Sequence, residues 1–175
     1  MTRRLVLLAI LALSCSGCPS IVKTEGMTAQ VTGSHHQGTE DVLVTVFGAA
    51  EHSDRKAVQF TNDRFAQALA TSLERSGLFR KAFLDTPGQY QLQANVTDVQ
   101  EEVLGINLTA SMTVSYVLVR MSPKALVWEK TVTSSHTAGV GDSVISITRL
   151  QMATEGAARK NIETVIHDLA SVKLE

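Results

Sequence analysis

Two cysteines are the residues whose type and spacing most clearly suggest chemistry. Cys15 and Cys18 form a C-x-x-C pair in the stretch "LALSCSGCPS". A redox pair of this spacing lies at a strand-to-helix junction of a thioredoxin-like unit, and no βαβ pattern surrounds this one. A zinc site needs further Cys or His ligands, and the nearest histidines, His35, His36 and His52, lie in segments rich in Gly, Ser and Thr. We therefore expect no redox centre, no metal site and no cofactor.

The residues before the cysteines indicate a secretory signal. Arg3 and Arg4 precede an uncharged apolar run over 5–13, and small residues follow over 14–18. This order is a positive n-region, an apolar h-region and a cleavage zone. At about 1.5 Å per residue, the run covers well under half of a hydrocarbon core of about 30 Å. A spanning helix is therefore not expected.

The end of the leader resembles the bacterial lipobox, in which an apolar and two small residues precede a cysteine that is acylated. Ser16-Gly17-Cys18 carries the resemblance, although Cys15 stands where the family usually has Leu. The resemblance implies cleavage after Gly17 and a palmitate-type lipid on Cys18, with Cys15 as the alternative attachment. Pro19 follows where Asp would favour inner-membrane retention in the enterobacterial pattern. This implies the periplasmic leaflet of the outer membrane.

Composition predicts one globular domain behind this leader. The chain has 175 residues, 44% of them hydrophobic, enough for a real core. Loss of Arg3 and Arg4 with the leader moves the net charge from −1 to −3. Because a nucleic-acid partner requires a basic face, none is expected. We assign 1–17 to the signal peptide, 18–40 to the lipidated N-terminus with a flexible tether, and 41–175 to a single α+β periplasmic domain.

Hydrophobic periodicity predicts the elements of that domain. A strand rich in β-branched residues over 41–50 is followed by an amphipathic helix over 55–76, with Ser53 or Asp54 as N-cap and Gly77 as C-cap. Three strands then follow, over 90–97, 105–121 and 125–137, and a second long helix is expected over 143–172, capped by Asp142 or Ser143. The order β-α-β-β-β-α predicts a two-layer sandwich, with two helices on one face of a four-stranded, mostly antiparallel sheet.

The strands over 90–97 and 105–121 alternate apolar and polar residues, so that one face packs on the core and the other faces water or a partner. Ordinary solvent-facing strands include Lys and Glu, which also discourage edge pairing. Here the polar positions carry no charge, which suggests contact with a protein, a glycan or a lipid. An ordinary Thr-rich strand, selected for its β-propensity, is the other interpretation and stays open. The candidate residues are Gln91, Gln93, Asn95, Thr97, Asn107, Thr109, Ser111, Thr113 and Ser115.

No catalytic motif of the common hydrolase, nucleotide-binding or metalloprotease types occurs. Glu101 and Glu102 adjoin on a hairpin, where neighbouring side chains point to opposite faces. We therefore do not expect an enzyme. The alternative, a small envelope hydrolase or ligand carrier, would need a pocket lined by Asp98, Glu101 or His136, because acid and base must come within hydrogen-bond reach.

Most of the chain resembles the small envelope lipoproteins of Gram-negative bacteria, including the YajG-like and the LptE-type lipopolysaccharide-assembly lipoproteins. The resemblance is carried by Cys18, by "FAQALATSLERSGLF" at 65–79, by "YQLQANVTDV" at 90–99 and by the closing "ATEGAARKNIETVIHDLASV". Resemblance to the LptE type implies a plug inside an outer-membrane β-barrel. The Gly-aromatic sequence that follows the cysteine in that type is missing here. The resemblance implies a non-catalytic lipoprotein that assists binding or assembly at the outer membrane, with the membrane and an envelope component as partners.

Overall fold

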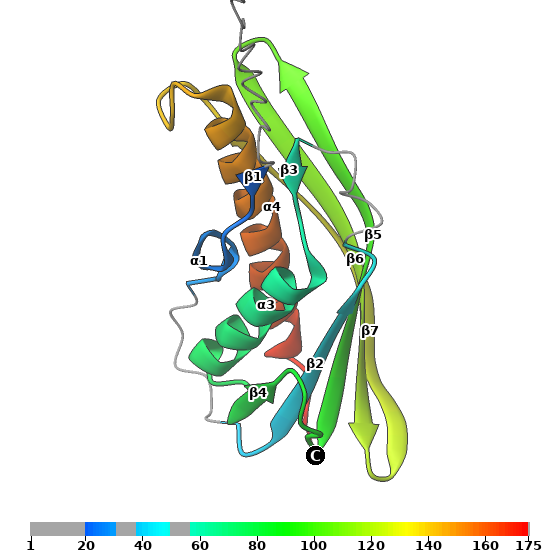
Figure 1. Ribbon diagram of the computed structural model, residues 1–175. Helices are drawn as coiled ribbons and strands as arrows, with labels where there is room; N and C mark the ends of the chain where they lie inside the picture. The colour runs from blue at the N-terminus through cyan, green and yellow to red at the C-terminus, as the bar shows by residue number, and fades with distance from the viewer. Residues whose placement is uncertain (1–19, 31–37, 50–56, 175) are drawn as a thin grey trace, which may run out of the picture.

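The computed structural model describes residues 20–30, 38–49 and 57–174, and the statements below concern these residues. Helices α1 (Thr24–Met27), α3 (Asn62–Ser76) and α4 (Ser146–Leu169) lie on one side of a five-stranded sheet (Figure 1). No described helix lies on the other side. The α+β class is confirmed, and the sheet has five strands rather than the expected four.

The sheet is mixed, with strand order β4-β2-β5-β6-β7. Its strands are β4 (Lys81–Phe83), β2 (Asp41–Phe47), β5 (Tyr90–Leu104), β6 (Asn107–Met121) and β7 (Lys124–Ala138). The last three form an antiparallel meander, whereas β2 runs parallel to both of its neighbours.

The mostly antiparallel four-stranded sheet predicted from the sequence is wrong in two respects. Strand β4 was missed because three residues are too few to show a period. Strand β2 pairs parallel with β5 because the intervening α3 forms a crossover connection, which parallel strands require.

A bulge in β5 reverses the alternation that the sequence shows. Val96 pairs with Val114 and Asp98 with Thr113, so Thr97 is an extra residue on this strand. Up to Val96 the even-numbered residues are buried against the helices, and beyond the bulge Val99 is buried instead. A bulge exchanges the faces of every later residue in the strand, since the side-chain period is two.

Helix α3 begins later than predicted. Thr61 is its N-cap and accepts a hydrogen bond from a backbone N–H one turn later, while the expected caps Ser53 and Asp54 lie outside the described residues. Residues Val58–Gln59 form the short strand β3. The expected C-cap is confirmed, because Gly77 adopts the left-handed conformation with φ 72° that only glycine takes at little cost.

Helix α4 is shorter than the predicted 143–172 at both ends. Its N-cap is Ile145, which makes no side-chain capping bond, and the expected caps Asp142 and Ser143 belong to the preceding loop. Ala153, Ala157 and Ala158 are fully buried. Small residues there let the helix lie close to the sheet.

The first described segment, residues 20–30, packs onto the helices although it belongs to the expected tether. Val22 and Met27 are buried in the main hydrophobic cluster, and β1 (Ser20–Ile21) pairs parallel with β3. The backbone N–H of Lys23 donates to Glu155 Oε1 over 2.7 Å. This part of the chain is therefore held by the domain. The contacts are long-range, and a sequence rich in Thr and Gly does not reveal them.

A buried polar group joins the sheet to α4. The Tyr116 hydroxyl donates to Asn161 Oδ1 over 2.8 Å, and Asn161 Nδ2 donates to the backbone oxygen of Val132 and to Ser134 Oγ, each over 3.0 Å. Ser134 Oγ in turn donates to the backbone oxygen of Ala157. Burial raises the pKa of Tyr116, so its phenol stays protonated and serves as the donor.

Candidate binding surface

The face of the sheet away from the helices is the candidate surface, here called the open face. All nine sequence-predicted residues lie on it or at its bulge, on strands β5 and β6, and none is buried. They are Gln91, Gln93, Asn95, Thr97, Asn107, Thr109, Ser111, Thr113 and Ser115. Their common placement follows from the alternation, whereas their role as a binding site remains a prediction.

Strand β7 adds a column of hydroxyls that the prediction left out. Thr109, Thr113 and Ser115 of β6 form hydroxyl-to-hydroxyl hydrogen bonds of 2.8, 3.0 and 2.9 Å. Their partners on β7 are Thr137, Thr133 and Thr131. The alternation in "TVTSSHT" was the available signal, because it repeats the pattern of β6. The cross-strand pairs fix these side chains in rows.

The bulge at Thr97 places charge at one end of the open face. Asp98 lies opposite Thr113, and Glu102 lies opposite Thr109, so both carboxylates share the face with the hydroxyls. Gln100 Nε2 donates to Asp98 Oδ2 over 2.7 Å. The open face is therefore uncharged over 91–97 and 107–115, as expected. It is charged on β5 beyond the bulge.

The opposite end of the open face is mainly apolar, with Gln91 between Leu43 and Val119. Leu43 lies beside Phe83 on β4, and Val119 lies beside Leu126 on β7. Leu126 is 59% exposed, although the two-residue spacing between Leu126 and Trp128 would place both on one face of a regular strand. A second irregularity, between Leu118 and Val119, separates these two residues in register. The open face therefore grades from hydroxyl-rich and acidic to apolar along the strands.

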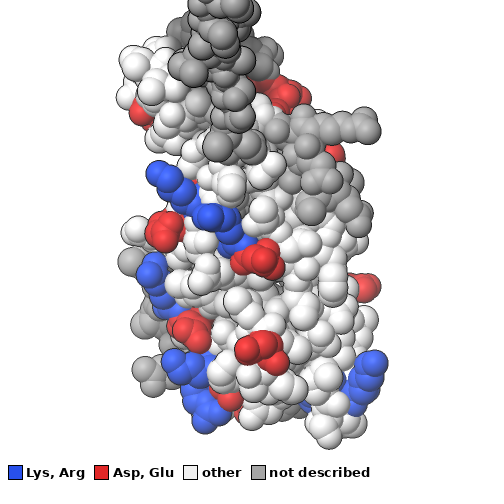
Figure 2. Space-filling model, in the orientation of Figure 1, with Lys and Arg blue, Asp and Glu red and all other residues white. Residues whose placement is uncertain are grey.

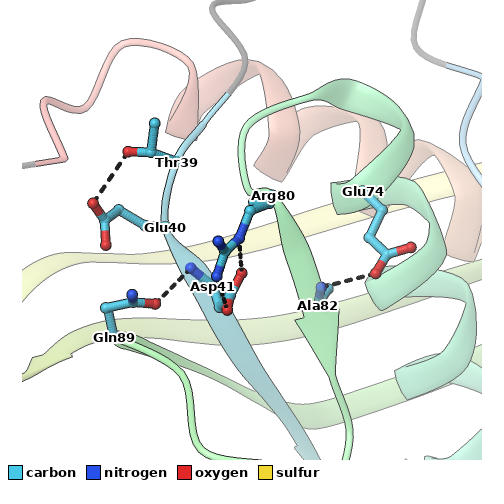
Figure 3. A network of polar contacts seen from close by, with 7 residues as sticks. All are labelled: Thr39, Glu40, Asp41, Glu74, Arg80, Ala82 and Gln89. Atoms are coloured by element: carbon cyan, nitrogen blue, oxygen red, sulfur yellow. Dashed lines mark hydrogen bonds and ion pairs between the residues drawn. The ribbon is translucent and has the colours of Figure 1, made fainter.

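An ion pair secures the edge of the sheet next to this apolar end (Figure 3). Arg80 donates from Nε and Nη2 to the two carboxylate oxygens of Asp41 over 2.9 and 2.6 Å. The hydrogen bond from Arg80 is the main reason that the pKa of Asp41 lies below its usual range. Glu74 accepts from the backbone N–H of Ala82, so both β2 and α3 hold the three-residue strand β4.

A shallow cavity of about 450 Å³ lies beside this ion pair, and Glu40, Asp41, Tyr90 and Arg120 are among its lining residues. The Nε atom of Arg120 is buried and makes no hydrogen bond to the described residues. Carboxylates and a guanidinium line the cavity together, so it does not offer a site for one sign of charge.

The structure does not bring together the residues of the hydrolase alternative. Asp98 lies on the open face, whereas Glu101 and His136 lie on the helix-covered side, in one row with Ala110 between them. The ring of His136 lies against Gly156 of α4. Burial, followed by the charges of Lys160 and Arg159, lowers the pKa of His136. The three side chains therefore cannot line one pocket.

Several predicted sites cannot be placed. Cys15 and Cys18, and the histidines His35, His36 and His52, lie outside the described residues. Within 20–30, 38–49 and 57–174, no group of three His, Cys, Asp or Glu is arranged to hold a metal ion. No helix in these ranges has the length and apolar character needed to cross a membrane.

Comparison with known proteins places the fold. No family model matches the sequence, and no curated protein matches it either. Protein XCC0632 from Xanthomonas campestris, of family DUF330, superposes with a TM-score of 0.61 at 13% identity, over 84% of this chain and 89% of that chain. The chain thus shares its architecture with nearly the whole of a solved bacterial protein.

Two further solved structures extend the comparison. A single-substitution variant of the PelC dodecamer from Paraburkholderia phytofirmans gives a TM-score of 0.55 at 18% identity, over 81% of this chain and 93% of that chain. A Caulobacter crescentus protein provisionally assigned as a lipoprotein gives 0.51 at 18% identity, over 74% and 88%. At these identities the similarity shows a shared fold.

Proposed function

We propose that this chain is a non-catalytic lipoprotein, attached through Cys18 to the periplasmic leaflet of the outer membrane, whose open face binds an envelope protein. The observation that carries the proposal is the open face itself. Five strands expose a surface on which rows of uncharged hydroxyls pass into an apolar end. Protein interfaces combine apolar contact area with polar groups that form hydrogen bonds, and the open face offers both.

The anchor is supported by the leader and by the class of proteins that share the fold. The mature chain would begin at Cys18, two residues before the packed strand β1. A neighbour of the same fold is provisionally assigned as a lipoprotein. Another is a dodecamer, which makes a second copy of this chain one candidate for the protein that the open face contacts.

Incorporation of labelled palmitate tests the anchor. We expect wild-type protein to be labelled, Cys18→Ala to lose the label and Cys15→Ala to retain it. If Cys18→Ala keeps the label and Cys15→Ala loses it, the attachment moves to Cys15. Absence of label from all three proteins overturns the anchor.

Photo-crosslinking in the native envelope tests the open face. A crosslinking amino acid at Thr113, on the open face, should capture a partner, whereas the same group at exposed His167 on α4 should not. The double substitution Thr109→Lys with Thr113→Lys should abolish capture from a crosslinker placed at Ser111. Thr164→Lys, an equivalent change on the exposed side of α4, is the matched control and should leave capture unchanged.

The identity of the captured protein distinguishes between two more specific functions. An outer-membrane barrel would support an LptE-type role in lipopolysaccharide assembly, and a second copy would support an oligomeric accessory. Equal capture from Thr113 and His167 would overturn the assignment of the binding face. The lysine variants should retain their thermal stability within about 1 kcal/mol, as surface changes generally do.

A further inference from the structure

Large apolar side chains are exposed at one end of the molecule. Val144 is 86% exposed, Ile106 65%, Ile145 58% and Val140 48%. Ile106 occupies the turn between β5 and β6, and the other three lie in the loop between β7 and α4. We call these four residues the apical patch. Scattered single apolar residues on a surface need no explanation, but a cluster marks an interaction site.

The two loops of the apical patch are adjacent. Leu108, just after the β5–β6 turn, pairs with Ala138, the last residue of β7. Gly139 lies next to Asn107, because a Cβ added to Gly139 would be 3.2 Å from Asn107 Oδ1. Figure 1 shows the β5–β6 turn and the β7–α4 loop at the upper end of the molecule. On the side that Figure 2 shows, Lys and Arg lie over the middle and lower parts, and Asp and Glu are also visible at the upper end.

The loop that carries Val144 and Ile145 is held by its own hydrogen bonds. Asp142 Oδ2 accepts from the backbone N–H of Gly139 over 2.8 Å, which closes the turn. Arg149, itself 7% exposed, donates from Nη1 to the backbone oxygen of Ser143 over 2.8 Å. These bonds fix the loop, on which Val144 and Ile145 remain exposed, as does Asp142.

The first described residues of the chain lie toward the same end. Ser20 Oγ donates over 2.7 Å to Gln151 Oε1, in the second turn of α4. Lys23 and Gly26 are tied to the same helix, through Glu155 and through a 3.0 Å bond from Arg159 Nη1 to the backbone oxygen of Gly26. Cys18 is two residues before Ser20, a reach of at most about 7 Å along the chain. The lipid attachment therefore cannot lie far from the apical patch.

We propose that the apical patch inserts into the leaflet that holds the lipid chain of Cys18. This inference rests on the proposed lipid anchor. Apolar side chains of membrane-surface proteins typically enter about 5–10 Å into the boundary between headgroups and acyl chains. The patch and the acyl chain then form two attachments at one end, and the domain cannot rotate freely on a tether.

The orientation bears on the open face. Strands β5, β6 and β7 run from the apical end to the opposite end of the molecule (Figure 1). With the apical patch in the leaflet, these strands stand roughly along the membrane normal. The open face is then presented sideways, toward proteins that share the same membrane.

Depth-dependent fluorescence on the lipidated protein tests the insertion. Cys15 leaves with the signal and Cys18 is acylated, so Val144→Cys introduces the one reactive thiol of the mature chain. The protein is labelled there with an environment-sensitive NBD dye and reconstituted into phosphatidylethanolamine–phosphatidylglycerol vesicles. Leu126→Cys, an exposed apolar position at the opposite end of β7, is the matched control, and Ile106→Cys is a second apical site.

We expect emission from 144 and 106 to shift to the blue and to be quenched several-fold more by nitroxide-labelled lipids than emission from 126. Equal accessibility of 144 and 126 to aqueous iodide, with the protein still floating with the vesicles, would overturn the insertion and leave the anchor standing. Shielding of 144 from iodide without quenching by labelled lipid would also overturn it, because protein would then cover the patch. Failure of the wild-type protein to float would overturn the anchor and the insertion together.

Discussion

The two faces of strand β6 show how one alternating sequence divides stability from recognition. On the covered face, Met112, Val114 and Tyr116 are buried, and the tyrosine hydroxyl has a specific partner on α4. On the open face, Thr113 and Ser115 pair with hydroxyls of the neighbouring strand and remain accessible to water. The covered face therefore contains the interactions that are costly to break, and the open face can change without unfolding the domain.

Asn161 should give the largest effect on the covered face. Asn161→Leu removes the acceptor of Tyr116 and the donor to Val132 and Ser134, and leaves buried polar groups without partners. We expect the free energy of unfolding to fall by about 2–4 kcal/mol, because each unsatisfied buried group costs about 1–3 kcal/mol. Urea denaturation followed by circular dichroism measures this change.

A second substitution separates the hydrogen bond from packing. Tyr116→Phe in the Asn161→Leu background removes the stranded hydroxyl, so it should be less harmful there than in the wild-type background. If the changes in the free energy of unfolding simply add, Tyr116 and Asn161 are not coupled. The covered face would then lack the specific hydrogen bond that distinguishes it from the open face.

Gly156 should give an intermediate effect whose sign depends on its neighbour. A Cβ at this position would lie 2.0 Å from Cδ2 of the His136 ring, so the ring must move. We expect Gly156→Ala to destabilise the protein by about 1–3 kcal/mol, the usual cost of overpacking. In a His136→Ser background the same change should stabilise it by about 0.5–1 kcal/mol, because alanine favours helix over glycine.

The double-mutant cycle compares the thermal unfolding of four proteins. They are the wild type, Gly156→Ala, His136→Ser and the variant with both changes. A destabilising Gly156→Ala in both backgrounds would show that backbone contacts, rather than the histidine ring, require glycine. Because Gly156 lies in α4 and His136 in β7, the cycle also tests the contact between the two layers.

The sequence predicted what local periodicity controls and missed what depends on partners distant in the chain. The alternation over 107–115 placed the hydroxyls on one face, and Gly77 marked the end of α3. The bulge at Thr97 was missed, although the change of the apolar positions from even numbers up to Val96 to the odd-numbered Val99 was its signal in the sequence. Its charged consequence, Asp98 on the open face, was missed with it.

The packing of residues 20–30 was also beyond reach of local patterns. It depends on Glu155, more than 130 positions away, which accepts from the backbone of Lys23. The apical patch shows a related limit. The strand predicted over 105–121 included Ile106, whereas this residue lies in the turn and is exposed, since β6 begins only at Asn107.

The smallest effect is expected on the open face, where Thr113 and Thr133 share a 3.0 Å hydrogen bond. The double substitution to valine keeps the shape and the β-branching of both side chains, and it removes both polar partners at once. Because exchanging both partners for apolar groups of the same shape is nearly neutral, the free energy of unfolding should change by less than about 0.5 kcal/mol. Chemical denaturation would detect a larger loss, and a cost comparable to that of Asn161→Leu would mean that the open face is a second core. A neutral result combined with altered crosslinking from Ser111 would instead assign these hydroxyls to recognition, since the partner would then sense a change that the fold does not.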